Sequence, residues 1–223
     1  MTRSSQSKRG AALQVLARVR RGDFDNYETR RDNLADADGT TRLSAHLKFG
    51  TISVRELYHA AAVTKSKGEP LIRQLYWRAF YDQLIWHFPH MLDGKLLRAP
   101  PTAWGVPKHA PAALNAWKAG RTGEPLVDAA MRVLANTGFL PNRARMVVAS
   151  YLIWNLRLDW RDGEHYFATQ LEDYHPSANS GNWQWLLLRQ RPSSVMSPQR
   201  QAERFDKDGA FQKSSTKTAS GDQ

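Results

Sequence analysis

The residues best suited to chemistry lie between Gly138 and Trp185. This stretch holds Arg143, Arg145, two groups of acidic residues, four tryptophans and an Asn-Ser-Gly-Asn turn that begins at Asn179. A charged side chain that is buried without a partner costs on the order of several kcal/mol, so buried arginine and aspartate need partners. Their density here predicts a binding site rather than simple packing.

Helices are the elements that would position these residues. Apolar side chains recur at the spacings of three and four residues that are typical of amphipathic helices, over the ranges 11–19, 53–64, 70–88, 112–119, 125–137 and 142–156. We expect Thr122 to cap the helix that Pro125 opens and Gly138 closes. Arg145 falls on an otherwise apolar helix face and needs an acidic partner, and considered alone such a pair is a structural salt bridge.

Two stretches lack this period. Residues 20–41 are polar and indicate a solvated loop, and residues 91–111 are rich in proline and basic side chains, which is typical of a surface connection. We therefore divide the chain into a basic N-terminal arm with a short helix (1–20), a helical domain (21–206) and a disordered tail rich in Lys, Ser and Thr (207–223).

Composition limits the classes of function. The 32 basic and 21 acidic side chains give a net charge of +11, which favours a polyanionic partner, although charge alone does not separate DNA, RNA and anionic membrane. No apolar run reaches the roughly 18 residues of a spanning helix and no signal sequence follows the N-terminus, so we expect an intracellular protein, in the cytoplasm or in the nucleus of a eukaryote. The chain has no cysteine, which excludes disulfides and thiolate chemistry and leaves any redox work to a bound organic cofactor.

Three motifs in the central stretch carry a family resemblance. They are Asn142-Arg143-x-Arg145-Met146, then Asp159-Trp160-Arg161-x-Gly163-Glu164-x-Tyr166-Phe167, and Asn179-x-Gly181-Asn182-Trp183-Gln184-Trp185. In order and spacing they resemble the flavin-binding domain of the DNA photolyase/cryptochrome family, and the resemblance is closest to the cyclobutane pyrimidine dimer photolyases. Two further segments, GTTRLSAHLKFGTISVRE and TGEPLVDAAMR, support it. The resemblance covers roughly residues 27–206. The resemblance implies an all-α fold, the photolyase-type FAD-binding helical domain, without the family's antenna domain.

The cofactor implied by the resemblance is FAD. The residues implied to bind it are Tyr27, Thr40, Thr41, Arg42, Leu43, Ser44, Arg145, Asp173, Tyr174, His175 and Asn179. Hydroxyl residues at a helix start leave backbone N–H groups for an anion, so the threonines and Ser44 are expected to hold the phosphates. Arg145 and Asp173 are expected to pair against the flavin ring, and Asn179 to face its N5 atom.

Electron transfer is implied for three residues. Asn179, Trp183 and Trp160 are the catalytic candidates, and the two tryptophans match the first members of the family's electron-transfer chain. Proline occupies the aligned place of the third member, for which Trp104 and Trp154 are the alternatives. Without the resemblance we would assign all eight tryptophans to packing.

The substrate implied is DNA that contains pyrimidine dimers. The residues expected to contact it are Arg31, Gln74, Trp77, Arg78, Tyr81, Asn142, Arg143, Trp185 and Gln201. Trp77 and Trp185 would form aromatic walls around a dimer that has been flipped out of the duplex. Arg143 is alternatively an ordinary phosphate contact, which gives affinity without lesion specificity.

Several positions depart from the family pattern. Gln74 stands where repair enzymes carry a glutamate, Pro141 replaces a histidine, His175 replaces an aspartate, and residues 186–198 lack the usual glycine-rich segment. Three hypotheses therefore remain. The first is a monomeric photolyase, a carbon-carbon lyase in which light drives an electron from reduced FAD into the dimer; the second is a cryptochrome-like blue-light receptor without repair activity; the third is a flavin-free DNA-binding relic. We expect no metal site, because His87 and His90 have no nearby carboxylate.

Overall fold

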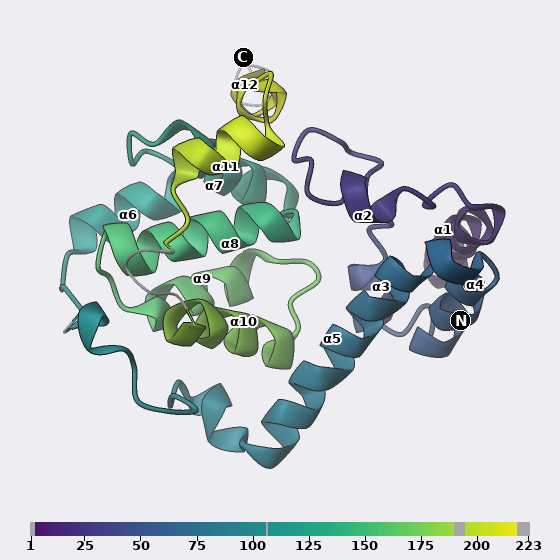
Figure 1. The fold of residues 1–223 in the computed structure, drawn as a ribbon, viewed down its shortest axis with the longest axis horizontal. Coiled ribbons are helices and arrows are strands. Elements are labelled where there is room, and N and C mark those ends of the chain that lie inside the picture. The colour runs from purple at the N-terminus through teal and green to yellow at the C-terminus, as the bar shows by residue number, and fades with distance from the viewer. Residues whose placement is uncertain (1–2, 106, 190–194, 218–223) are drawn as a thin grey trace. The chain divides into compact units, whose positions relative to one another are not determined.

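The computed structural model describes residues 3–105, 107–189 and 195–217. Within these ranges the regular elements are all helices, and the expected all-α class is confirmed (Figure 1). The chain divides into two compact units, Met1–Gln83 and Leu84–Gln223. None of the helices in the described ranges is long and apolar enough to cross a bilayer.

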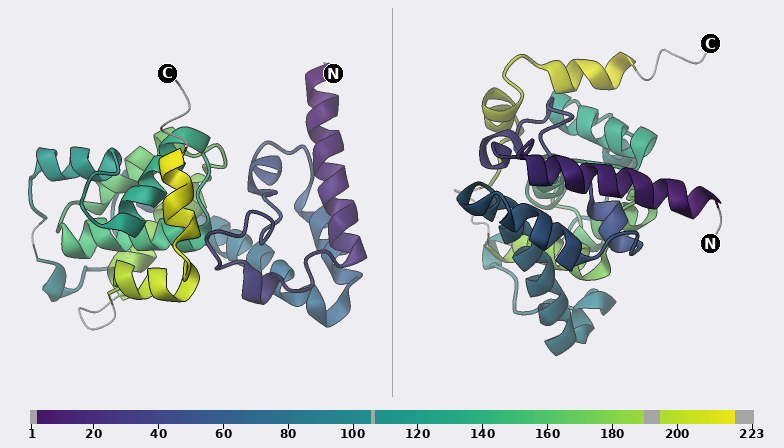
Figure 2. Two further views of the ribbon diagram at one scale, coloured as in Figure 1. Left: turned by 90° about the horizontal axis from the view of Figure 1, so that it is seen from above. Right: turned by 90° about the vertical axis from the view of Figure 1, so that its right-hand side faces the viewer.

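Unit 1 is built around the contact between two helices. Its elements are α1 (Arg3–Arg21), α2 (Tyr27–Arg30), α3 (Ser44–Lys48), α4 (Val54–Ala62), the 3₁₀ turn η1 (Lys65–Lys67) and most of α5 (Glu69–His87). α1 packs against α4 (Figure 2), and the buried core joins Ala12 and Leu16 of α1 to Leu57 and Ala60 of α4. The side chain of Ser53 caps α4, because the Glu56 N–H donates to its Oγ at 3.1 Å while the Glu56 carboxylate accepts from the Ser53 N–H at 2.7 Å.

The beginning of the chain differs from the expectation. We expected a basic arm before a helix that starts near Ala11, whereas α1 already starts at Arg3. Arg9 donates to the backbone oxygen of Thr51 at 2.6 Å and pairs with Glu56 at 2.9 Å, so this basic segment is tied to the start of α4. The expected loop at 20–41 is mostly irregular but contains the single turn α2.

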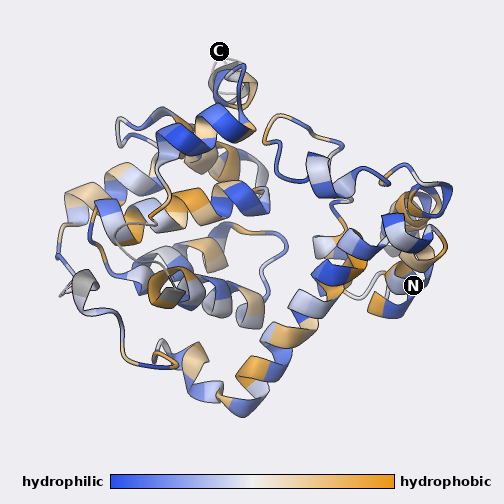
Figure 3. Cartoon of the chain, in the orientation of Figure 1, coloured by the Kyte–Doolittle hydropathy of each residue, from blue (hydrophilic) through white to orange (hydrophobic). Residues whose placement is uncertain are grey.

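Unit 2 holds the central motif stretch. Its elements are η2 (Pro89–Asp93), η3 (Thr102–Trp104), α6 (Pro111–Lys118), α7 (Pro125–Thr137), α8 (Asn142–Ser150), the π-helical turn η4 (Tyr151–Asn155), α9 (Trp160–Gln170), α10 (Pro176–Arg189), α11 (Pro198–Phe205) and α12 (Ala210–Lys217). α10 packs against α8 and α9, while α7 packs against α8, α11 and α12 (Figure 1). The apolar residues along α8 (Figure 3) supply part of the core, with Ala144, Val147 and Val148 completely buried.

Two local expectations in unit 2 were wrong, and a third, the helix over 142–156, was correct in its extent but not in its type. The helix expected over 142–156 is α-helical only to Ser150 and continues as a π-helical turn. Thr122 does not cap α7; instead Asp128 accepts hydrogen bonds from the N–H groups of Thr122 at 2.7 Å and Gly123 at 3.0 Å, and so fixes the preceding loop. Residues 210–217 of the expected disordered tail form α12.

The reason for the last difference lies in two residues. Phe211 is only 5% exposed, so α12 buries an apolar side chain. Asp206 accepts from the N–H groups of Phe211 at 2.9 Å and Gln212 at 3.2 Å, which satisfies the first turn of this helix. A composition rich in Lys, Ser and Thr concealed this single apolar anchor. Residues 218–223 of the expected tail lie outside the described ranges.

Candidate functional site

The ion pair expected between Arg145 and Asp173 forms in unit 2. Arg145 Nη2 lies 3.0 and 2.9 Å from the two carboxylate oxygens of Asp173, and Arg145 Nε donates to the backbone oxygen of Leu140 at 2.6 Å. The side chain of Asp173 is 7% exposed and that of Arg145 is 25% exposed. Arg145 Nη1 makes no hydrogen bond within the described ranges, so the guanidinium is held firmly while one donor group stays available.

Asn179 on α10 is held by Glu164 on α9. Asn179 Nδ2 donates to the backbone oxygen of Glu164 at 3.1 Å and to its carboxylate Oε1 at 2.8 Å. Burial raises the pKa of the Glu164 carboxyl above its usual value of 4.5, while the Asn179 hydrogen bond and the neighbouring His165 oppose that rise. The Oδ1 atom of Asn179 has no hydrogen-bond partner in the part of the chain that the structure describes.

Trp183 belongs to a buried aromatic cluster. It is 2% exposed, and its ring centroid lies 5.2 Å from that of Phe167 and 6.4 Å from that of Trp117. The Trp117 ring stacks on Phe167 at 6.2 Å and also contacts Tyr166 at 5.8 Å. These rings explain why α9 and α10 pack closely around the motif residues.

Trp160 is equally buried but lies outside that cluster. Across the described ranges no ring contact joins it to Trp183, and its Nε1–H has no hydrogen-bond partner there. Trp104 and Trp154, the alternatives for a third electron-transfer residue, are both buried. Arg157 links them, because it donates to the backbone oxygen of Trp104 at 3.2 Å and lies over the Trp154 ring at 6.0 Å.

Tyr174 and His175 follow Asp173 in the segment that leads into α10. Both residues are half-buried. Burial, and to a smaller extent the charge of Glu164, raises the pKa of the Tyr174 hydroxyl above its usual value of 10.0. The backbone oxygen of His175 accepts from the Asn179 N–H at 2.8 Å, which closes the first turn of α10. This turn carries Asn179 to within reach of Glu164.

In unit 1, the expected phosphate loop precedes α3. Thr41 Oγ1 accepts from the Leu43 N–H at 3.4 Å, and Arg42 has a left-handed backbone with a φ of 51°. The hydroxyls of Thr40 and Ser44 make no hydrogen bond within the described ranges, and no side chain caps α3. Since α3 has only five residues, its helix dipole is small, so the hydroxyls and the backbone N–H groups of this loop are the groups here that could bind an anion.

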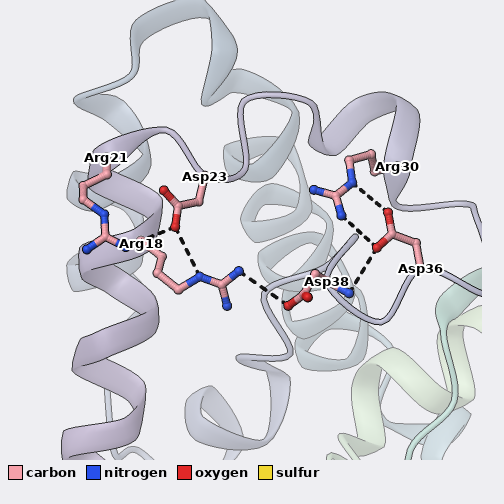
Figure 4. Close-up of polar contacts among 6 residues, drawn as sticks. All are labelled: Arg18, Arg21, Asp23, Arg30, Asp36 and Asp38. Atoms are coloured by element: carbon pink, nitrogen blue, oxygen red, sulfur yellow. Dashed lines mark hydrogen bonds and ion pairs between the residues drawn. The ribbon is translucent and has the colours of Figure 1, made fainter.

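A clamp of two residues shapes the turn that enters this loop. Arg30 Nε and Nη2 donate to the two oxygens of Asp36 at 2.7 and 2.8 Å, and Asp36 also accepts from the Asp38 N–H at 3.1 Å (Figure 4). The Arg30 hydrogen bond lowers the pKa of the Asp36 carboxyl below its usual value of 3.8. Gly39 passes so close to Arg30 that a β-carbon there would lie 2.8 Å from the Arg30 backbone oxygen.

Tyr27 and Arg31 lie together at α2. The Arg31 guanidinium is 5.9 Å from the centroid of the Tyr27 ring, and it also pairs weakly with Glu28 at 3.6 Å. Burial raises the pKa of the Tyr27 hydroxyl above its usual value. Glu28 pairs in addition with Arg73 of α5 at 2.6 Å, so α2 is fastened to α5 within this unit.

The expected substrate residues of α5 have different environments. Trp77 is 48% exposed and contacts Phe80 and Tyr81, with ring centroids 5.6 and 6.2 Å away. Tyr81 is buried, which raises the pKa of its hydroxyl to about 12. Gln74 Nε2 donates to the Pro70 backbone oxygen at 2.9 Å, so the amide nitrogen is occupied by its own helix, while Arg78 is half-buried.

The remaining substrate candidates lie in unit 2. Arg143 of α8 stacks on the Phe205 ring of α11 at 4.5 Å, and Gln201 is on the same helix α11. Asn142 begins α8 and contacts the sulfur of Met146 at 3.5 Å. Trp185 is exposed on α10. The contact between Arg143 and Phe205 thus places Arg143 beside the helix that carries Gln201.

Sequence reasoning missed the supporting residues. Glu164, Gly163, Arg30 and Asp36 shape the candidate site but were not among the expected site residues. Glu164 and Gly163 do occur in a quoted motif, and that was the only signal available for them. No group of three or more His, Asp or Glu side chains gathers at one point within the described ranges.

The polar groups left available suit a flavin nucleotide. The ring edge of a flavin offers both carbonyl acceptors and a nitrogen that carries hydrogen in the reduced form. Arg145 Nη1 is a fixed donor and Asn179 Oδ1 is a fixed acceptor, on the neighbouring helices α8 and α10. In unit 1, the hydroxyls of Thr40 and Ser44 suit phosphate oxygens. The residues present therefore fit FAD.

Comparison with known proteins gives a consistent result. Residues 71–215 match the family model described as the FAD binding domain of DNA photolyase. The deoxyribodipyrimidine photo-lyase of Escherichia coli (strain K12) is 38% identical over 214 residues, which are 90% of this chain and 44% of that protein.

Two solved structures have a similar fold. An archaeal photolyase from Sulfolobus tokodaii, described with two FAD molecules, matches with a TM-score of 0.77 at 41% identity, over 92% of this chain and 46% of that one. A cryptochrome from Synechocystis sp. PCC6803 matches with a TM-score of 0.82 at 30% identity, over 92% of this chain and 44% of that one. The chain thus spans less than half the length of each of these relatives.

Proposed function

Because the chain belongs to the DNA photolyase family through its FAD-binding domain, we propose that it binds FAD and takes part in the light-driven splitting of cyclobutane pyrimidine dimers in DNA. The observation that carries this proposal is the pair of open polar atoms, Arg145 Nη1 and Asn179 Oδ1, held on helices that pack together. The remaining polar atoms of both side chains make hydrogen bonds that hold the side chains in place. A bound ring system needs such hydrogen-bonding groups, which are held in place and have no partner in the protein.

The residues of unit 2 would hold the ring of FAD. When bound in its reduced form, FAD supplies the electron that breaks the dimer after excitation by light. Arg145 would donate to the ring and keep a positive charge beside it, while Asp173 fixes the guanidinium. Asn179 would accept a hydrogen bond from the ring, and the cluster around Trp183 would exclude water from this side of the site.

The residues of unit 1 would hold the phosphates and part of the DNA. Thr40, Thr41 and Ser44 offer hydroxyls on a loop that the Arg30–Asp36 pair shapes. Trp77 is exposed on α5 and would stack on an extruded base. Trp185 of unit 2 is also exposed and, considered by itself, is a second candidate for such stacking. Arg143 and the net charge of +11 would supply salt-dependent affinity for the DNA backbone.

A second candidate function is that of a cryptochrome-like light receptor without repair. It is favoured by Gln74, whose amide nitrogen bonds to its own helix and whose side chain is neutral. An amide cannot serve as an acid or as a countercharge to a reduced dimer. The similarity to the Synechocystis cryptochrome is compatible with this candidate as well as with repair.

The test combines spectroscopy with a repair assay. The protein is purified in the dark, its absorption is recorded before and after reconstitution with FAD, and loss of dimers is followed under blue light with a chemical reductant. We expect a flavin spectrum and light-dependent repair that falls strongly in Trp185→Ala, with the exposed Trp86→Ala as a matched control that repairs normally. Flavin binding without repair in protein that still binds DNA would favour the receptor. Failure to bind FAD would leave only the DNA-binding relic.

A further inference from the structure

One aromatic ring on α11 contacts two arginines of unit 2. The guanidinium carbon of Arg143, on α8, lies 4.5 Å from the centroid of the Phe205 ring, and that of Arg204 lies 5.1 Å from the same centroid. Phe205 and Arg143 are half-buried, whereas Arg204 is exposed. Two cationic groups that start from different helices are therefore held beside one uncharged side chain.

Arg204 keeps its charge, because no carboxylate near it in the sequence pairs with it. Within the described ranges Arg204 makes no hydrogen bond and no ion pair, and the adjacent Glu203 forms no ion pair either. The Asp206 carboxylate is buried and already accepts from the N–H groups of Phe211 at 2.9 Å and Gln212 at 3.2 Å. The N–H groups of the Arg204 guanidinium are thus available to a ligand.

The type of contact decides what such an arginine can bind. An aromatic ring attracts a guanidinium through its face, so it holds the group in place and leaves the N–H groups at the edge of the guanidinium open. A carboxylate, such as that of Asp173 beside Arg145, uses those N–H groups and cancels the charge. Phe205 therefore holds positive charge without neutralising it. Two like charges held near each other in this way repel, and an anion that binds beside both of them relieves the repulsion.

We propose that Phe205 is a positioning residue that holds Arg143 and Arg204, the arginine pair, in place to bind a backbone phosphate of a nucleic acid. Planar guanidinium groups match the oxygens of phosphate with paired hydrogen bonds, and the net charge of +11 favours a polyanion. The inference rests on the DNA-binding part of the proposed function. It adds Arg204 as a phosphate contact and gives Phe205 a role that acts through the two arginines.

The first experiment measures the affinity of the full chain, incubated with FAD in the dark, for an undamaged DNA duplex between 50 and 200 mM salt. Each phosphate contact steepens the loss of affinity over this range by about threefold. We expect Arg143→Gln and Arg204→Gln each to remove about one contact. Phe205→Leu should remove at least one contact without any change in net charge, and Phe205→Tyr, which keeps a ring, should bind like the wild type. Equal salt dependence of Phe205→Leu and the wild type would overturn the proposal.

Two comparisons separate positioning from a general effect of charge or of folding. Arg20→Gln removes the same charge from an exposed arginine in the last turn of α1, and it should leave the salt dependence close to that of the wild type. In the double variant Arg143→Gln/Arg204→Gln, adding Phe205→Leu should have no further effect, because the ring then has no guanidinium to hold. The proposal fails if Arg20→Gln lowers the salt dependence as much as Arg204→Gln, or if Phe205→Leu still weakens binding in the double variant.

The second experiment uses only the wild type, so it decides the question even if Phe205→Leu is found by circular dichroism to be unfolded. The Nε–H signals of Arg143 and Arg204 are assigned by NMR and followed while the same duplex is added. We expect nuclear Overhauser contacts from both side chains to the Phe205 ring, and a shift of both signals in parallel. A shift of one signal alone, or of neither, would overturn the arginine pair.

The failure of this inference can be told apart from the failure of the proposed function. The duplex carries no lesion, so its binding tests the arginine pair and not repair. A wild type that binds the duplex through the pair but binds no FAD would end the proposed photolyase function and leave the pair established. A wild type that binds FAD and repairs dimers, while Phe205→Leu keeps the full salt dependence, would end the inference alone.

Discussion

Gly163 of α9 lies directly against the indole ring of Trp183 in α10. A β-carbon at residue 163 would overlap Cη2 of that ring and would lie 2.8 Å from Cζ3. Trp183 cannot move away easily, because it is also in contact with Phe167 and Trp117. The missing side chain at this one position therefore sets how closely α9 and α10 approach, and with it the distance between Glu164 and Asn179.

We predict that Gly163→Ala destabilises the protein. The added methyl group overpacks a rigid aromatic cluster, which costs about 1–3 kcal/mol of unfolding free energy. Chemical denaturation measures this loss. Gly10→Ala is the matched control, since nothing lies within 4 Å of a β-carbon there and alanine is the better helix former. Equal stability of Gly163→Ala and the wild type would contradict the packing described for Trp183.

The Arg145–Asp173 pair yields a second prediction. Asp173→Asn leaves the guanidinium without its countercharge in a mostly buried position, and we expect a loss of about 2 kcal/mol, less than for a completely buried pair because Arg145 is partly exposed. Arg73→Ala is the control, because its pair with Glu28 is half exposed and should contribute no more than about 0.5 kcal/mol. Urea denaturation measures the free energy of unfolding of the two variants and of the wild type. A similar small effect from both would show that Asp173 does not serve as the countercharge.

The Arg30–Asp36 pair in unit 1 predicts that the stability of the protein depends on pH in the acidic range. Arg30 lowers the pKa of Asp36, so the stability that this pair contributes is present above the ordinary value of 3.8 and is lost as the pH falls through the lowered pKa. Asp36→Asn should therefore cost about 0.5–1 kcal/mol at neutral pH. The difference from the wild type should vanish at low pH. Thermal unfolding between pH 2 and 7 tests this, with the exposed Asp38→Asn as a variant that should behave like the wild type.

Glu164 predicts a pH dependence of the opposite sign. Burial raises its pKa, so its contribution to stability is complete below the ordinary value of 4.5 and is lost as the pH rises through the raised pKa. The other titratable groups coupled to it are His165 and Tyr174. Glu164→Gln should gain stability relative to the wild type between pH 4 and 7. Melting curves across that range check the prediction, and parallel pH profiles for the two proteins would refute it.

Local sequence patterns were sufficient for most helices. The expected range 70–88 corresponds to α5 at Glu69–His87, and 53–64 corresponds to α4 at Val54–Ala62. An amphipathic helix leaves its period in neighbouring residues, and Pro125 and Gly138 mark the ends of α7 by backbone preference alone. α12 escaped prediction, because one buried phenylalanine in a polar segment leaves no period to detect.

By itself, the sequence determined the helical class, the basic charge and the family motifs, since these depend on composition and on spacings along the chain. The family motifs also led to the pairing of Arg145 with Asp173, which the structure then showed across 28 positions of the chain. Only the tertiary structure showed that Asn179 meets Glu164 across 15 positions. The packing of α9 against α10 decides which end of the Asn179 amide lacks a hydrogen-bond partner. It also decides how closely the Trp183 ring approaches Gly163. Such contacts arise from the approach of two helices, and the period of either helix alone does not record them.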